Sequence, residues 1–178
     1  MHREANLQRT TTAAVALLLC AGVLPAQESV ATSPHAVARD TLRGLDGVHV
    51  VVEELRPEAV DDGLSKEAIE EEAVQRLWDA GVRVLMEDQW TIAAGAPYLY
   101  LNVNAVKSKD LYVYAVDLQL NQNVRLERIP SVAVAATTWT TGCRVGAVSA
   151  DSVRVLAQVA AQSVDRFIED YRRANPAN

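Results

Sequence analysis

Two stretches in the middle of the chain alternate between apolar and polar side chains with a period of two. They cover residues 98–105 and 111–120, and the polar segment 107–110 lies between them. A period of two is typical of a strand that is buried on one face, so the pattern predicts a β-hairpin. A turn of two or four residues places Leu101 opposite Val116 and makes one face of the hairpin wholly apolar.

The segments before the hairpin predict a strand, a helix and a second strand. Residues 48–55 are rich in β-branched side chains and apolar on both faces in their middle, as in an interior strand. A helix is predicted over 65–80, with Ser65 as its N-cap and one apolar stripe. Residues 82–86 then form a short strand. The short links between these three elements favour parallel pairing of the two strands through a right-handed crossover.

The segment after the hairpin predicts one more strand. Residues 132–141 return along the sheet and place Trp139 opposite Leu120 in the core, with Ala133 and Ala135 beside it. Small side chains at the last two positions would let a helix approach the sheet closely.

A loop over Gly142 to Gly146 is predicted to lead into a long final helix. Ser149 or Asp151 is its expected N-cap. An apolar stripe runs along its length, formed by Val153, Leu156, Ala160, Val164, Phe167 and Tyr171. The order of elements is thus β-α-β-β-β-β-α. With both helices on one face of a mixed sheet of about five strands, it predicts an α/β (α+β) two-layer sandwich.

The first 26 residues have the order of a secretory signal peptide. A weakly basic start is followed by an apolar run over 13–24 and then by Pro25 and Ala26. The run is too short to cross a membrane, which needs about 20 apolar residues. Cys20 follows a leucine rather than a small residue, so a lipid anchor there is not favoured. We expect an exported protein without a transmembrane helix in its mature chain.

The remainder of the chain is predicted to be a flexible tether and one domain. Residues 27–43 show no sustained hydrophobic period, which is typical of a tether, and residues 44–178 carry all the predicted elements. A chain of 178 residues with 49% hydrophobic residues supports a single packed core. Its net charge of −6 argues against binding to nucleic acid, which requires a clustered basic face.

Candidate catalytic chemistry is sparse, so we expect neither a metal, nor a cofactor, nor enzymatic activity. His35 and His49 have no partner at metal-ligand spacing, and the acidic clusters lack the spacing of a calcium loop. A hydrolase assembled from His49, Glu53 and Asp117 is the least favoured alternative. Removal of the leader leaves Cys143 as the single cysteine. It is a free reactive thiol, a partner for another chain, or a small buried side chain.

The helix-free face of the sheet is the candidate interaction surface. The hairpin register places six side chains there: Tyr98, Tyr100, Asn102, Asn104, Asp117 and Gln119. Tyrosine and amide side chains are enriched at protein contact surfaces, because tyrosine offers a large area at low entropic cost. The sequence therefore predicts a non-enzymatic adaptor that binds a protein partner, or itself, through this face or a sheet edge. The alternative is a small-ligand or glycan site between the sheet and the loop over 142–147.

Three motifs give the chain a resemblance to a family of secreted bacterial proteins of uncharacterised activity. They lie at residues 47–53 (GVHVVVE), 96–104 (APYLYLNVN) and 124–128 (VRLER). More distantly, the order of elements is similar to the amino-terminal domain of TolB and to CsgG-like and penicillin-binding-protein-activator lipoproteins. The resemblance implies an assembly or adaptor role in the bacterial envelope or periplasm.

Overall fold

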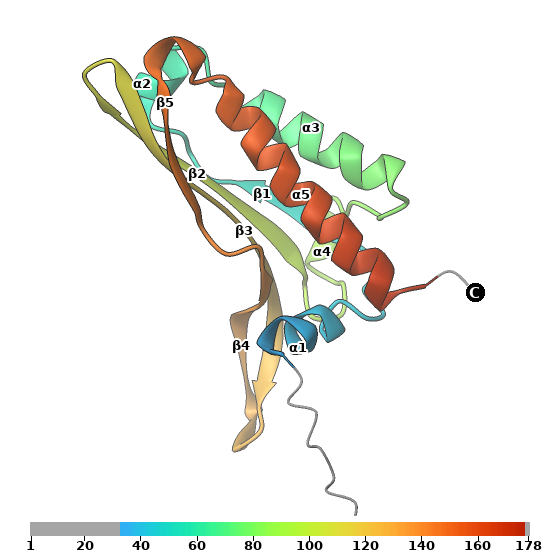
Figure 1. Cartoon of the computed structure of the whole chain (residues 1–178). Helices are drawn as coiled ribbons and strands as arrows, with labels where there is room; N and C mark the ends of the chain where they lie inside the picture. The colour runs from blue at the N-terminus through green and yellow to red at the C-terminus, as the bar shows by residue number, and fades with distance from the viewer. Residues whose placement is uncertain (1–32, 177–178) are drawn as a thin grey trace, which may run out of the picture. The chain divides into compact units, whose positions relative to one another are not determined.

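The computed structural model describes residues 33–176. These residues fold into a five-stranded mixed sheet with helices on one face (Figure 1). The sheet order is β1-β2-β3-β4. β5 pairs with the first half of β3, along the same edge whose second half pairs with β4. β1 pairs with β2 in parallel and the other pairs are antiparallel. The strands are β1 (His49–Val52), β2 (Tyr98–Ser108), β3 (Leu111–Leu126), β4 (Ile129–Thr140) and β5 (Arg144–Ser149). The predicted α+β sandwich is confirmed.

Two long helices cover the inner face of the sheet, and shorter helices lie around its ends (Figure 1). The helices are α1 (Pro34–Asp40), α2 (Pro57–Asp61), α3 (Lys66–Asp79), α4 (Glu87–Trp90) and α5 (Val155–Ala174), with a 3₁₀ turn at Ala150–Ser152. α3 and α5 are the two covering helices. None of the helices in the part of the chain that the structure describes combines the length and the apolar character needed to cross a membrane.

The β2–β3 hairpin confirms the predicted alternation. Leu99, Leu101, Val103 and Ala105 are buried, whereas the side chains between them are half-buried or exposed. The predicted pairing is displaced by two residues, because the turn is Lys109–Asp110 and Leu101 lies opposite Leu118. A shift of two residues leaves every side chain on the same face of the sheet. The two faces are therefore as the sequence predicts.

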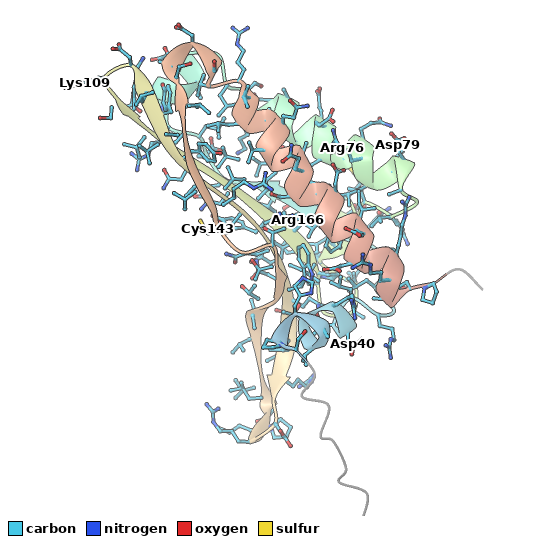
Figure 2. The ribbon with its side chains drawn as sticks, in the orientation of Figure 1. Asp40, Arg76, Asp79, Lys109, Cys143 and Arg166 are labelled. Carbon is cyan, nitrogen blue, oxygen red and sulfur yellow. The ribbon has the colours of Figure 1, made fainter. Side chains whose placement is uncertain are left out.

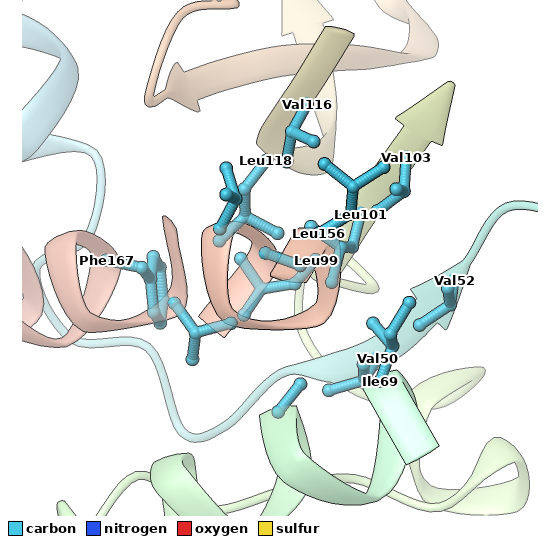
Figure 3. Close-up of a cluster of buried hydrophobic side chains, with 14 of the residues drawn as sticks. Val50, Val52, Ile69, Leu99, Leu101, Val103, Val116, Leu118, Leu156 and Phe167 are labelled. Atoms are coloured by element: carbon cyan, nitrogen blue, oxygen red, sulfur yellow. The ribbon is translucent and has the colours of Figure 1, made fainter. Parts of the chain in front are cut away.

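The core lies between this inner face and the two covering helices. In Figure 3, Leu156 of α5 lies beside Leu99 and Leu101, Phe167 lies further along the same helix, and Ile69 of α3 lies beside β1. The indole of Trp139 meets the Phe167 ring edge-on, with centroids 5.3 Å apart.

Helix α3 begins as its sequence predicts. The Ser65 hydroxyl oxygen accepts a hydrogen bond from the Ala68 amide at 3.1 Å, which satisfies one of the free amides of the first turn. Leu64 and Ile69 on either side of the cap are both buried, as in a hydrophobic staple.

The strand expected over 82–86 is reduced to a single parallel β-bridge between Val84 and Val48. Val48 donates to the Arg83 carbonyl and accepts from the Leu85 amide, both at 2.9 Å, after which the chain turns into α4. The close approach requires Gly47, since a β-carbon there would lie 2.7 Å from the Arg83 carbonyl oxygen.

The loop expected over 142–146 is largely a strand. β5 pairs with β3, where Val145 lies opposite Ala115 and Gly146 opposite Tyr114. The Tyr114 ring packs directly on Gly146. A β-carbon at this position would lie within 3 Å of three atoms of the ring and its hydroxyl, so only glycine fits. The final helix α5 begins at Val155 with Arg154 as its N-cap, so the predicted caps at Ser149 and Asp151 are wrong.

The far ends of β3 and β4 form a two-stranded ribbon that extends past α1 (Figure 1). Trp139 lies opposite Leu120 and is buried, as predicted. Ala133 and Ala135 are exposed, so their predicted place in the core is wrong. The ribbon projects because β2 begins at Tyr98, opposite Asn121 of β3. Beyond that point, no third strand among the described residues pairs with β3 or β4.

Part of the predicted tether is structured. α1 packs against β4 and α5, and Leu42 is fully buried. Asp170 on α5 is also buried and accepts from the Trp139 indole at 3.0 Å, while His35 of α1 lies 3.3 Å from the same carboxylate. The tether prediction is therefore wrong from Pro34 onward, because a buried carboxylate and the core hold this segment. Residues 27–32 and the predicted signal peptide lie outside the described residues.

A buried tyrosine fixes α2 against the end of the hairpin. The Tyr112 hydroxyl lies 2.7 Å from both an Asp62 carboxylate oxygen and the Glu58 carbonyl, and the Lys107 ammonium donates to the same carboxylate. Hydrogen bonds from Lys107 and Tyr112 lower the pKa of Asp62. Burial and the Asp62 carboxylate raise the pKa of Tyr112 to about 12. Both shifts stabilise the folded protein with Asp62 charged and Tyr112 neutral.

These pKa shifts predict a pH dependence of stability. Because the pKa of Asp62 is lower in the folded state, its contribution is complete above its ordinary pKa of 3.8 and is lost as the pH falls towards the lowered value. The melting temperature of the wild type should therefore fall more steeply between pH 5 and pH 2 than that of Asp62→Asn. Equal slopes for the two proteins, measured by circular dichroism, would contradict this account.

Candidate functional site

All six predicted surface residues lie on the outer face of the sheet, which α3 and α5 do not cover. Across β2 and β3 they form rows in which Tyr98 faces Asn121, Tyr100 faces Gln119, and Asn102 faces Asp117. Asn104 is exposed, and the other five are half-buried. The predicted placement of these side chains is thus correct, while their role in binding stays a prediction.

A polar ladder of hydrogen bonds crosses three strands on this face. Asp117 accepts from the Asn102 amide at 3.4 Å and from the Gln119 amide at 2.8 Å. The Thr137 hydroxyl of β4 lies 3.1 Å from the Gln119 amide oxygen and 2.8 Å from that of Asn121, and it donates to one of them at a time. These side chains satisfy one another, so the ladder is held in one arrangement before any partner arrives.

The tyrosine end of the face is partly covered by α4. Trp90 stacks on the His49 ring with centroids 5.1 Å apart and meets Tyr98 edge-on at 5.7 Å. Its indole nitrogen donates to the Ala96 carbonyl at 2.7 Å. Sequence reasoning missed this contact, because nothing in the local pattern of 87–97 indicates which way the tryptophan folds. Tyr98 therefore offers less contact area than its position predicts.

The opposite end of the face is apolar and open. Val106 and Val113 lie opposite each other across the hairpin, and Val145 of β5 lies in the next row. Their exposed fractions are 46%, 50% and 70%, and Leu111 beside them is 50% exposed. We refer to Val106, Leu111, Val113 and Val145 as the valine patch. The sequence did not reveal it, because the segment that carries Val145 was predicted to be a loop.

His49 and Asp117 of the hydrolase alternative are not brought together. His49 lies opposite Tyr98, whereas Asp117 lies opposite Asn102, two strands away and four residues further along. Strand spacing and rise put these two side chains roughly 16 Å apart. The His49 Nδ1 atom lies 2.9 Å from the Leu85 carbonyl oxygen. Within residues 33–176 no group of three or more His, Cys, Asp or Glu side chains is arranged to hold a metal ion.

A shallow polar hollow of about 300 Å³ opens on the outer face beside the end of β1. Glu53, Arg56, Tyr100, Asn102 and Asn104 contribute to its lining. The Arg56 Nε atom donates to the Asn104 amide oxygen at 3.0 Å, which fixes two of these groups. The ligand site expected beside the 142–147 segment lacks its loop wall, because most of that segment is β5.

Cys143 is exposed, and Figure 2 shows it at the bend that leads from β4 into β5. The interpretation as a small buried side chain is therefore wrong. It is a free thiol.

No protein-family model matches the chain, and no curated protein matches it. One similar solved structure is a PelC dodecamer from Paraburkholderia phytofirmans, at 20% identity and a TM-score of 0.41, covering 72% of this chain and 90% of that one. Another is a minor lipoprotein from Acinetobacter baumannii, at 11% identity and a TM-score of 0.28, covering 71% and 91%. Likeness at this level gives no argument about function. The more specific resemblance to TolB and CsgG-like proteins stays a prediction.

Proposed function

We propose that the protein is an exported, non-enzymatic interaction domain of the bacterial envelope or periplasm that binds a protein partner through the outer face of its sheet. The observation that carries this proposal is the valine patch, which lies beside the polar ladder on a face that neither α3 nor α5 covers. Export is supported by the pattern of residues 1–26, and the envelope by the order of elements, which is similar to that of envelope lipoproteins.

The arrangement matches the composition of protein interfaces. An apolar centre bordered by polar groups is the usual organisation of such surfaces, and contiguous exposed apolar patches mark interaction sites. Burial of apolar surface contributes about 25 cal/mol per Å², so the valine patch supplies the driving force. The polar ladder adds specificity at low entropic cost, because its side chains are already ordered by mutual hydrogen bonds.

Site-specific photo-crosslinking tests this proposal. A photoreactive amino acid at Val113, in the middle of the valine patch, should give a discrete crosslinked species in the cells that produce the protein. Val60 on α2 is the matched control, because its exposed fraction of 48% is close to that of Val113 at 50%.

A second variant separates binding from folding. Val145→Asp in the Val113 crosslinking background should abolish the adduct and leave the melting temperature nearly unchanged, since the side chain is 70% exposed. An adduct of equal yield from Val60, or none from Val113, would contradict the proposal.

The polar hollow supports a second candidate function, the binding of a small polar ligand or glycan. Its lining combines an aromatic ring with carboxylate, amide and guanidinium groups that are suited to hydroxyl-rich molecules. Titration with a panel of mono- and disaccharides should then shift the side-chain amide resonances of Asn102 and Asn104, and Asn104→Ala should weaken binding by about tenfold. Saccharide binding that Asn104→Ala leaves unchanged, or no shift at millimolar concentrations, would exclude this site.

A further inference from the structure

Strand β4 lies at the edge of the sheet and carries no charged side chain. The sequence from Ile129 to Cys143 contains no Asp, Glu, Lys or Arg. Every residue over 129–135 is exposed, although these positions include Ile129, Val132 and Val134. β4 pairs with β3 along one side, and its other side faces no strand within residues 33–176.

The sequence of β4 is that of an interior strand. Val132 and Val134 point to one face of the ribbon, and Ala133 and Ala135 point to the other. Strands that are apolar on both faces are normally buried on both faces. Ala133, Ala135, Val132 and Val134 are all exposed, so nothing covers either face of this part of β4 within residues 33–176.

The other edge strands are protected along their length, whereas the middle of β4 is not. Folded proteins prevent unwanted strand pairing by short edge strands, charged side chains or a covering segment. β1 has four residues and is bridged by Val84, while β5 has six residues and begins with Arg144. β4 has 12 residues, and only its ends carry protecting features: Pro130 near its start, and near its end the contact with α1, where the Thr41 hydroxyl donates to the Thr138 carbonyl at 3.3 Å.

We propose that β4 pairs with β4 of a second copy of this chain in antiparallel orientation, so that the two sheets become one. A two-fold pairing uses the same strand on both sides, which requires a strand without charges that would repel their own copies. If Val134 lies at the centre, Arg128 of one copy meets Thr140 of the other, and no like charges face each other.

The size of this contact predicts a weak dimer. Seven paired residues over 131–137 extend for about 24 Å, and the pairing covers on the order of 400 Å² on each copy. Such an area is at the low end for specific interfaces, which bury about 800 Å² per partner. The dimer should therefore form at micromolar concentrations. It does not use the valine patch, so the two surfaces can be tested separately.

Sedimentation velocity of the purified full chain between 1 and 100 µM gives the first test. The wild type should shift from monomer to dimer over this range. Val134→Lys should remain monomeric at 100 µM, because a lysine on an edge strand opposes pairing. Val60→Lys, at an exposed position on α2, is the matched control and should dimerise normally. Far-UV circular dichroism verifies that both variants fold.

Disulfide trapping gives a second test that does not depend on affinity. In a Cys143→Ser background, Ala133, Val134 and Ala135 are replaced by cysteine one at a time. An isologous pairing centred within 133–135 places one of these residues against its own copy, within the distance that a disulfide spans. That variant should form a covalent dimer under mild oxidation, while Val60→Cys does not. A monomer at 100 µM without trapping at any of the three positions, or an oligomer that Val134→Lys leaves intact, overturns the proposal.

Discussion

Burial of one face of the β2–β3 hairpin beneath α5 is the constraint on which the structure depends. Leu99, Leu101 and Leu118 are almost completely buried there, in one cluster with Leu156 and Phe167 of α5 (Figure 3). Because side chains alternate along a strand, fixing these residues inside also fixes which residues face outward. The polar ladder and the valine patch are therefore consequences of the same packing that forms the core. A change that reversed the hairpin would remove both.

The elements with strong local signals were predictable from the sequence. The alternation of residues 98–120, the Ser65 cap and the pairing of Trp139 with Leu120 all depend on side chains close together in the chain or on one repeated period. The exact hairpin register was not predictable, because a turn at Lys109–Asp110 and one centred a single residue earlier segregate the faces equally well. Only the packing of the whole sheet distinguishes them.

The differences from the sequence prediction arise where tertiary contacts decide. The segment 82–86 resembles a strand, but the close approach at Gly47 and the start of α4 leave it one bridge. β5 contains a glycine that is needed under the Tyr114 ring, and this glycine made the segment resemble a loop. Of the candidate site, the outward placement of six side chains followed from alternation. Two features did not follow from alternation: the contact of Trp90 with Tyr98, and the place of Val145 in the valine patch. Both residues come from segments that lie apart from the hairpin in sequence.

The most direct test of this account is a cysteine scan along β2 in a Cys143→Ser background, with residues 99–104 replaced one at a time and thiol labelling rates measured in the folded protein. The account predicts a period of two, with fast labelling at positions 100, 102 and 104 and protection at 99, 101 and 103. Fast labelling at the three protected positions, or a period of three to four residues, would contradict it. In that case the outer face would not be the open surface on which the proposed function rests.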